Sequence, residues 1–110
     1  MTLNEKIVQD IENTTIILYM KGTKERPSCG FSARVVSVLH RHSIVYQDVN
    51  VLENQEIRVR LLEHSNWPTI PQLFVKGELI GGCDIVMEME SKGKIGRCAA
   101  DSRDLVTTTK

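Results

Sequence analysis

The sequence contains little cysteine. Its three thiols, Cys29, Cys83 and Cys98, are odd in number and lie far apart in a chain of 110 residues. This pattern fits neither a disulfide framework nor the paired C-x-x-C spacing of a zinc site. It favours a reducing compartment, so we expect the protein to be cytoplasmic, or to lie in an organelle matrix after processing.

The chain also lacks an excess of charge of either sign and any long apolar run. Fourteen basic residues balance fourteen acidic ones, so no net charge steers the protein toward nucleic acid or an anionic membrane. The longest apolar run, Ile16 to Met20, is far too short to cross a bilayer. Glu5, Asp10 and Glu12 argue against a signal or transit peptide. We expect a soluble protein with no nucleic-acid or membrane partner.

Apolar periodicity predicts alternating helices and strands. Leu3, Ile7, Val8 and Ile11 share one face of a first helix, and the run from Thr14 to Met20 is typical of a strand buried on both faces. Ser28 is a good N-cap for a second helix, whose apolar stripe is Ala33, Val35, Val36 and Leu39. The later elements are predicted to be a strand at 44–49, a helix at 54–64, a hairpin of strands 73–75 and 78–80 turning at Lys76-Gly77, and a last helix that Asp84 caps and that stops near Gly93.

This order of elements predicts the fold class. A strand, a helix and a strand followed by a hairpin give an α/β protein with a four-stranded mixed sheet flanked by helices, the thioredoxin-like fold. The length and the apolar fraction of 41% suit one compact core. We expect residues 1–110 to form a single domain, with its core in about residues 1–95 and a poorly specified C-terminal tail at 96–110.

The stretch RPSCGFS, residues 26–32, places one thiol at the start of the second helix. A C-x-x-C pair there would indicate a dithiol site, but Ser32 occupies the second sulfur position. The helix N-terminus favours the thiolate of Cys29, and Lys21 at the end of the first strand adds a positive charge nearby. Cys29 is therefore predicted to be a nucleophile or a metal ligand. The alternative, a buried structural cysteine, is disfavoured by the Pro, Ser and Gly around it.

Two further segments are predicted to meet beside this thiol. A cis proline at Pro71 would turn the backbone of Ile70 outward to pair with an extended peptide, although an ordinary trans proline explains the same residues. The run from Gly81 to Asp84 combines small residues with a helix N-terminus, which suits an anionic group. Its aspartate suits an ammonium group, or merely caps the helix.

Arg58 and Lys21 are each suited to bind a carboxylate, or are solvated surface charges. With the two segments above, they describe a cleft for a short peptide that has two acidic ends and a central thiol. Glutathione has that form.

Four segments together resemble the monothiol, CGFS-type glutaredoxins in their single-domain form. The resemblance covers about residues 1–95 and is carried by Lys21-Gly22, Cys29-Gly30-Phe31-Ser32, Trp67-Pro68-Thr69-Ile70-Pro71-Gln72 and Gly81-Gly82-Cys83-Asp84-Ile85. It implies a thioredoxin fold, glutathione bound in the cleft, and a 2Fe-2S cluster that bridges two protomers.

The resemblance also implies roles for single residues. Cys29 is implied to be the cluster ligand and Phe31 to help wall the site. Glutathione is implied to be held by Lys21, Arg58, the backbone of Ile70, and Cys83 with Asp84. The tail after Gly93, with Cys98, falls outside these segments and inherits no role.

A function in iron–sulfur cluster transfer and biogenesis is the first hypothesis. A 2Fe-2S centre usually needs four thiolates, and one chain offers a single sulfur placed for this purpose. Two chains with two glutathione thiols complete the set, which predicts a homodimer when the cluster is bound. Cys83 and Cys98 are rival ligands, although Cys83 is better placed to give backbone contacts to glutathione. The resemblance adds BolA-like proteins and iron–sulfur recipient apoproteins as partners.

The alternative is a glutathione-dependent thiol–disulfide oxidoreductase acting through Cys29 in deglutathionylation. Ser32 cannot resolve a mixed disulfide, and an insertion like the loop from Gly22 to Arg26 accompanies poor oxidoreductase activity in the family. We therefore expect at most weak enzymatic activity. A redox-inert interaction module is a third class, and it predicts that glutathione does not stabilise the protein.

Overall fold

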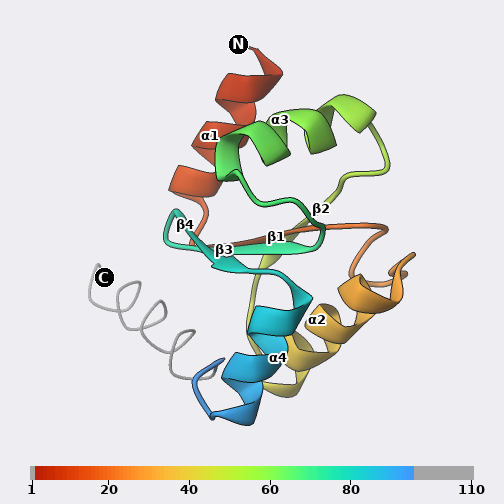
Figure 1. The fold of residues 1–110 in the computed structure, drawn as a ribbon, viewed down its shortest axis with the longest axis vertical. Coiled ribbons are helices and arrows are strands. Elements are labelled where there is room, and N and C mark those ends of the chain that lie inside the picture. The colour runs from red at the N-terminus through yellow and green to blue at the C-terminus, as the bar shows by residue number, and fades with distance from the viewer. Residues whose placement is uncertain (1, 96–110) are drawn as a thin grey trace.

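The computed structural model describes residues 2–95, in which helices and strands alternate as the sequence predicts (Figure 1). In chain order they are α1 (Leu3–Asn13), β1 (Ile16–Met20), α2 (Gly30–Arg41), β2 (Gln47–Asn50), α3 (Gln55–Ser65), β3 (Gln72–Val75), β4 (Glu78–Gly81) and α4 (Cys83–Ser91). The expectation of a poorly specified tail, and Cys98 with it, lie outside the described residues.

The strands form one mixed sheet in the order β2-β1-β3-β4. β1 is parallel to β2, to which α2 connects it, and antiparallel to β3, while β3 and β4 form an antiparallel hairpin. The hairpin turns at Lys76 and Gly77, whose φ angles of 53° and 84° are both positive. A two-residue turn of this kind requires such angles. The predicted four-stranded mixed sheet and thioredoxin-like fold are confirmed.

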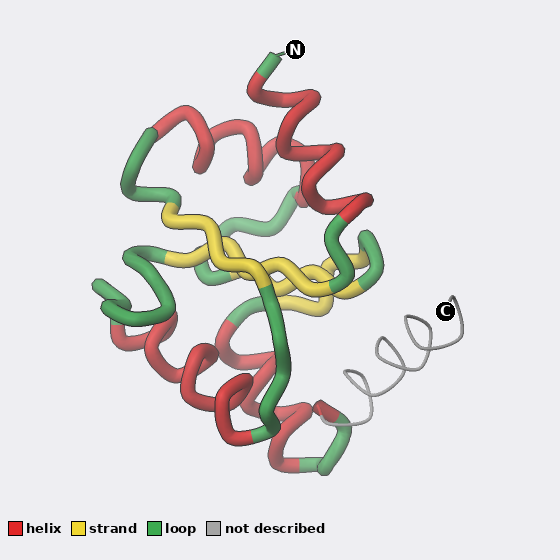
Figure 2. Tube along the Cα trace, turned by 180° about the vertical axis from the view of Figure 1, so that it is seen from behind, coloured by secondary structure: helices red, strands yellow, loops and turns green. Residues whose placement is uncertain are grey.

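Helices cover both faces of the sheet, with α1 and α3 on one face and α2 and α4 on the other (Figures 1 and 2). Every residue of β1 is buried, as predicted. Because side chains alternate along a strand, Ile17 and Tyr19 join the apolar cluster under α1 and α3, whereas Leu18 and Met20 join the cluster under α2 and α4. The core therefore has two halves, one on each side of the sheet.

Several local predictions from the sequence are wrong. The N-cap of α2 is Cys29 itself, not Ser28, and the N-cap of α4 is Gly82, with Asp84 in the first turn. Ala33 is exposed, because the buried face of α2 instead includes Ser32 and Val38.

Two predicted strands also begin too early. The first starts at Ile16 rather than Thr14. The second starts at Gln47 rather than Ile44, because the pairing with β1 begins only at Gln47. Ile44 and Tyr46 are nevertheless buried, so the alternation in the sequence reflects real burial outside the ladder.

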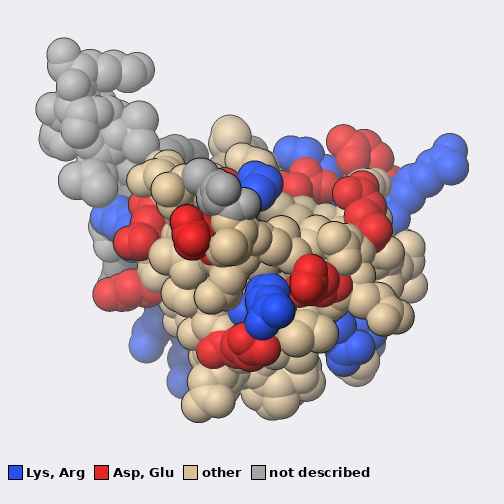
Figure 3. All heavy atoms as spheres, turned by 90° about the horizontal axis from the view of Figure 1, so that it is seen from above, with Lys and Arg blue, Asp and Glu red and all other residues tan. Residues whose placement is uncertain are grey.

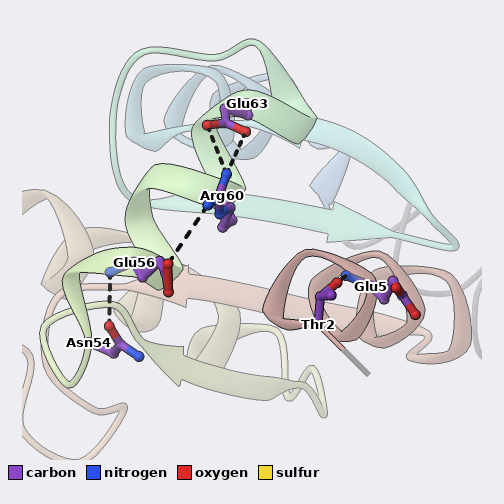
Figure 4. A network of polar contacts seen from close by, with 6 residues as sticks. All are labelled: Thr2, Glu5, Asn54, Glu56, Arg60 and Glu63. Carbon is purple, nitrogen blue, oxygen red and sulfur yellow. Dashed lines mark hydrogen bonds and ion pairs between the residues drawn. The ribbon is translucent and has the colours of Figure 1, made fainter.

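Polar side chains stabilise α1 and α3, the helices that share one face of the sheet (Figure 4). Oγ1 of Thr2 accepts a hydrogen bond from the amide of Glu5 at 3.1 Å and so caps α1. Oδ1 of Asn54 accepts from the amide of Glu56 at 2.9 Å and caps α3. These caps satisfy N–H groups that have no partner inside the helix.

The surface on the side of α1 and α3 carries acidic and basic side chains interspersed (Figure 3), in keeping with a formal net charge of zero. Among the helices of residues 2–95, none has the length and apolar character that a membrane span would need.

Candidate functional site

One edge of the sheet gathers the segments singled out in the sequence. The strands β1 and β2 end there, β3 begins there, and α2 and α4 start from it. A cleft of about 320 Å³ opens at this edge, lined by Lys21, Cys29, Phe31, Arg58, Pro68, Thr69, Ile70, Pro71, Cys83 and Asp84. The structure thus brings together every site residue that the sequence predicted.

The Cys29 side chain lies at the N-terminus of α2. As N-cap, Cys29 precedes N–H groups that have no partner inside the helix. The backbone N–H of Ser32 lowers the pKa of the Cys29 thiol most, and the N–H of Phe31 and the charge of Lys21 lower it further, against a partial burial that raises it. The pKa lies below its ordinary value of 9.0, which favours the thiolate, the form that attacks disulfides and binds metals.

Ser32, which stands where a dithiol site has its second sulfur, is completely buried. Its Oγ accepts a hydrogen bond from the backbone N–H of Lys21 at 3.1 Å. The serine therefore ties the end of β1 to the first turn of α2. Sequence reasoning treated Ser32 only as a missing sulfur, and nothing in the local pattern indicated this contact between residues 11 apart.

Cys83 differs from Cys29 in its environment. It is 7% exposed, and burial is the main cause that raises the pKa of its thiol, outweighing the nearby charge of Arg34. Its thiol is therefore protonated at neutral pH, which leaves Cys29 as the reactive sulfur among the described residues.

The segment before β3 forms one wall of the cleft. The peptide bond between Ile70 and Pro71 is cis, so the cis alternative considered for the sequence is the one that occurs. The completely buried Gln72 donates from Nε2 to the carbonyl oxygens of Trp67 and Thr69, at 3.0 and 3.1 Å. Sequence reasoning quoted Gln72 only as part of a motif and missed this positioning contact.

Gly82 allows α4 to approach this wall closely. A Cβ atom there would lie 3.0 Å from the carbonyl oxygen of Pro71 and 3.4 Å from Nε1 of Trp67. The absence of a side chain at this position therefore keeps the N-terminus of α4 against the segment that contains Ile70.

The charged residues of the cleft are available to a ligand. Within residues 2–95, no ion pair engages Lys21 or Arg58, and Asp84 is exposed in the first turn of α4. Two cations, one carboxylate and a helix N-terminus thus line the cleft together with the Cys29 thiol. Such an arrangement can bind a small zwitterion that has more than one carboxylate.

A metal ion at Cys29 would need ligands from outside the chain. Among the described residues, no group of three or more histidine, cysteine, aspartate or glutamate side chains is arranged to hold one.

Comparison with known proteins agrees with this geometry. The glutaredoxin family model matches residues 16–80. A probable monothiol glutaredoxin 2 of Rickettsia felis is 48% identical over 91 residues, which make up 83% of this chain and 88% of that protein.

Two solved structures are also similar. Reduced apo GrxS14 of poplar has a TM-score of 0.80 and 38% identity, over 93% of this chain and 94% of the poplar chain. A buckwheat glutaredoxin in complex with glutathione has a TM-score of 0.80 and 25% identity, over 91% of this chain and 89% of the buckwheat chain. The chain therefore belongs to the glutaredoxin family, in its monothiol branch.

Proposed function

We propose that the protein binds glutathione in the cleft and, as a homodimer, holds a 2Fe-2S cluster that it transfers to iron–sulfur apoproteins. The observation that carries this proposal is that, among residues 2–95, Cys29 alone has a thiol with a lowered pKa, and that it lines a cleft together with Lys21 and Arg58, which form no ion pair within those residues. In the same proposal the chain is a single domain that acts in the cytoplasm. BolA-like partners remain a prediction from the family resemblance.

The cleft suits glutathione in size and charge. A volume of about 320 Å³ accommodates a short peptide that stays partly exposed. Lys21 and Arg58 would bind one carboxylate, and the N-terminus of α4 at Cys83 and Asp84 would bind the other, with the Asp84 side chain near the ammonium group. The backbone of Ile70 would pair with the middle of the peptide, and Phe31 would wall the site. The glutathione complex of the buckwheat relative supports glutathione as the ligand.

The described thiols fit a cluster that is shared between chains. Cys29 is the one with a lowered pKa, whereas Cys83 is buried and its pKa is raised. The described part of one chain therefore offers one of the four sulfur ligands that a 2Fe-2S centre usually needs. A second chain and two glutathione thiols supply the other three. The cluster, when bound, supplies the iron and sulfide that a recipient apoprotein needs.

The ligands explain why such a cluster would be easy to transfer. Cys29 of each of the two chains would hold it from the cleft, and the other two ligands would dissociate with glutathione. Lys21 and Arg58 would retain glutathione through its carboxylate, so that their loss weakens the cluster without removing a sulfur ligand.

Anaerobic reconstitution with iron, sulfide and glutathione tests the proposal. We expect a coloured dimer, measured by its visible absorption and its mass on size-exclusion chromatography. Cys29→Ser should lose both colour and dimer, whereas Cys83→Ser should keep most of both because the Cys83 thiol is buried. A colourless wild-type monomer would contradict the proposal, as would a coloured Cys29→Ser dimer.

The lowered pKa of Cys29 also supports the alternative of a thiol–disulfide oxidoreductase. The Cys29 thiolate would attack the glutathione sulfur of a protein–glutathione disulfide and release the protein thiolate. A second glutathione thiolate would then attack the Cys29–glutathione disulfide, releasing oxidised glutathione and restoring the Cys29 thiolate. Fast turnover of a glutathionylated peptide by a protein that cannot be reconstituted would favour this function.

A further inference from the structure

The loop between β1 and α2, residues 21–29, is held against β2 by side chains outside the cleft. The amide of Gly22 donates to Oδ1 of Asn50 at 2.9 Å, and the amide of Lys24 donates to Oδ2 of Asp48 at 2.9 Å. Asp48 and Asn50 are alternate residues of β2, which is an edge strand of the sheet, so their side chains leave the strand on the same side. Together they provide two fixed acceptors for the loop.

The Lys24 side chain adds a third attachment. Its Nζ donates to the carbonyl oxygen of Tyr46 at 3.1 Å and lies 4.9 Å from the centroid of the Tyr46 ring. Tyr46, Asp48 and Asn50 thus contact the loop at every second residue. The loop is attached at three places, to Tyr46 just before β2 and to Asp48 and Asn50 within it.

The loop itself is internally closed. Thr23 and Arg26 exchange two backbone hydrogen bonds, at 3.2 and 3.1 Å, and Gly22 forms a bridge with Pro27. Such a closed loop moves as one unit, so that an anchor at Gly22 or Lys24 also fixes the residues beside Cys29.

These anchors lie one step from the cleft. Lys21 precedes Gly22, and its N–H donates to Oγ of Ser32 while its carbonyl accepts from the N–H of Ser28 at 2.9 Å. Lys21 and Cys29 both line the cleft. A shift of the loop would therefore move the ammonium group relative to the thiolate.

We propose that Asn50 and Asp48 are positioning residues for the cleft: they hold the loop of residues 21–29 on β2 and thereby keep the Lys21 ammonium group beside Cys29. The inference concerns the site of the proposed function and rests on that function only where glutathione affinity is measured. Asn50 should contribute more than Asp48 to holding the loop, because its Oδ1 also accepts a hydrogen bond from the amide of Leu52 at 2.9 Å and is thereby held in place.

The test is the rate at which iodoacetamide alkylates Cys29, measured by peptide mass spectrometry across pH, together with glutathione affinity by calorimetry. Asn50→Ala should slow alkylation at neutral pH by roughly two- to fivefold, the effect of one partly solvated charge, and weaken glutathione binding by about as much. Asn50→Asp keeps an acceptor oxygen and should restore both the alkylation rate and the affinity for glutathione. If Asn50→Ala does not fold, Asp48→Ala removes the other anchor and should act in the same direction.

Ile11→Val is the matched control, because it shortens a buried side chain of α1 far from the loop. It should lower the melting temperature without slowing the alkylation of Cys29. An Asn50→Ala protein that is alkylated as fast as Ile11→Val would overturn the inference.

A double-mutant comparison shows whether Asn50 acts through Lys21. Lys21→Met should slow alkylation, and adding Asn50→Ala should slow it no further. Effects that multiply would overturn the inference, because Asn50 would then act by another route. Failure of wild-type protein to bind glutathione would refute the proposed function alone, since the alkylation rates do not depend on glutathione.

Discussion

At the scale of single residues, the reactivity of Cys29 depends mainly on backbone atoms. The N–H of Ser32 is the largest cause that lowers the pKa of the thiol, and the Ser32 side chain is the smallest of those that lower it. The helix start, rather than any one side chain, therefore does most to favour the thiolate. This explains why a position that can be recognised in the sequence as the beginning of a helix also predicts the chemistry of the cysteine.

Among the described glycines, Gly22 is the one at which substitution should be most costly. Its φ is +87°, and a Cβ atom would lie 2.5 Å from both the carbonyl oxygen of Arg26 and the amide nitrogen of Ser28. Both the backbone angle and the lack of space oppose a side chain. We expect Gly22→Ala to lower the free energy of unfolding, measured in urea, by about 2 kcal/mol or more.

Gly30→Ala is the control for this substitution. Gly30 begins α2, and a Cβ atom there would meet nothing within 4 Å. The same change should therefore leave stability unaltered or raise it by up to about 1 kcal/mol. Equal decreases in the free energy of unfolding in the two variants would show that the lack of space around Gly22 is not the reason why Gly22→Ala destabilises the protein.

At the scale of elements, the sequence predicts order and type well and boundaries less well. The apolar run that became β1 is buried on both faces, and the Lys76-Gly77 turn was recognisable from its residues. The caps of α2 and α4 were misplaced: α4 begins two residues earlier than Asp84 allows, with Gly82 as its N-cap, and Ser28 is held in the loop before α2. Ser28 donates its amide to the carbonyl of Lys21 and so belongs to the preceding loop.

The start of α3 allows a comparison between a cap and an ion pair (Figure 4). Oδ1 of Asn54 accepts a hydrogen bond from the Glu56 amide, so Asn54→Ala should lower the free energy of unfolding by about 1 kcal/mol. Asn54→Asp keeps an acceptor oxygen and should retain most of the stability. Arg60 lies 3.7 Å from Glu56 and 3.3 Å from Glu63, with 40% of its side chain exposed. Because solvent screens such pairs, Arg60→Ala should cost about 0.5 kcal/mol or less.

Urea unfolding of the three variants measures both costs. The α3 helix carries Arg58 to the cleft, so the comparison also shows which contacts hold that residue's helix in place. A larger loss from Arg60→Ala than from Asn54→Ala would show that the ion pairs, and not the cap, determine the stability of α3.

At the scale of the whole molecule, the composition of the cleft was predictable but its construction was not. Every predicted site residue lines it because strand ends and helix starts converge at one edge of this fold. The supports of the site come from contacts between residues distant in sequence: Asp48 and Asn50 bind amides that precede them by 24 and 28 positions. No local pattern reveals such pairs, because in the sequence each of these residues is only a polar position in or next to a predicted strand.

Both tyrosines of the chain are buried, and this couples the stability of the whole molecule to alkaline pH. Burial, reinforced by the charges of Asp48 and Glu25, raises the pKa of Tyr46 from 10.0 to about 12, and burial raises the pKa of Tyr19 in the same direction. The folded protein therefore holds protons that the unfolded chain releases. This contribution to stability is complete below pH 10.0 and is lost as the pH rises through about 12.

Titration of tyrosinate absorbance in the near ultraviolet tests this coupling. We expect the native protein to show no ionised tyrosine at a pH where the chain in denaturant is already half ionised, and its free energy of unfolding to fall as the pH rises above about 10. Tyr46→Phe should make this fall shallower, because Tyr19 alone would then contribute. Native tyrosines that ionise together with those of the denatured chain would show that neither hydroxyl is shielded, and that the two halves of the core admit water.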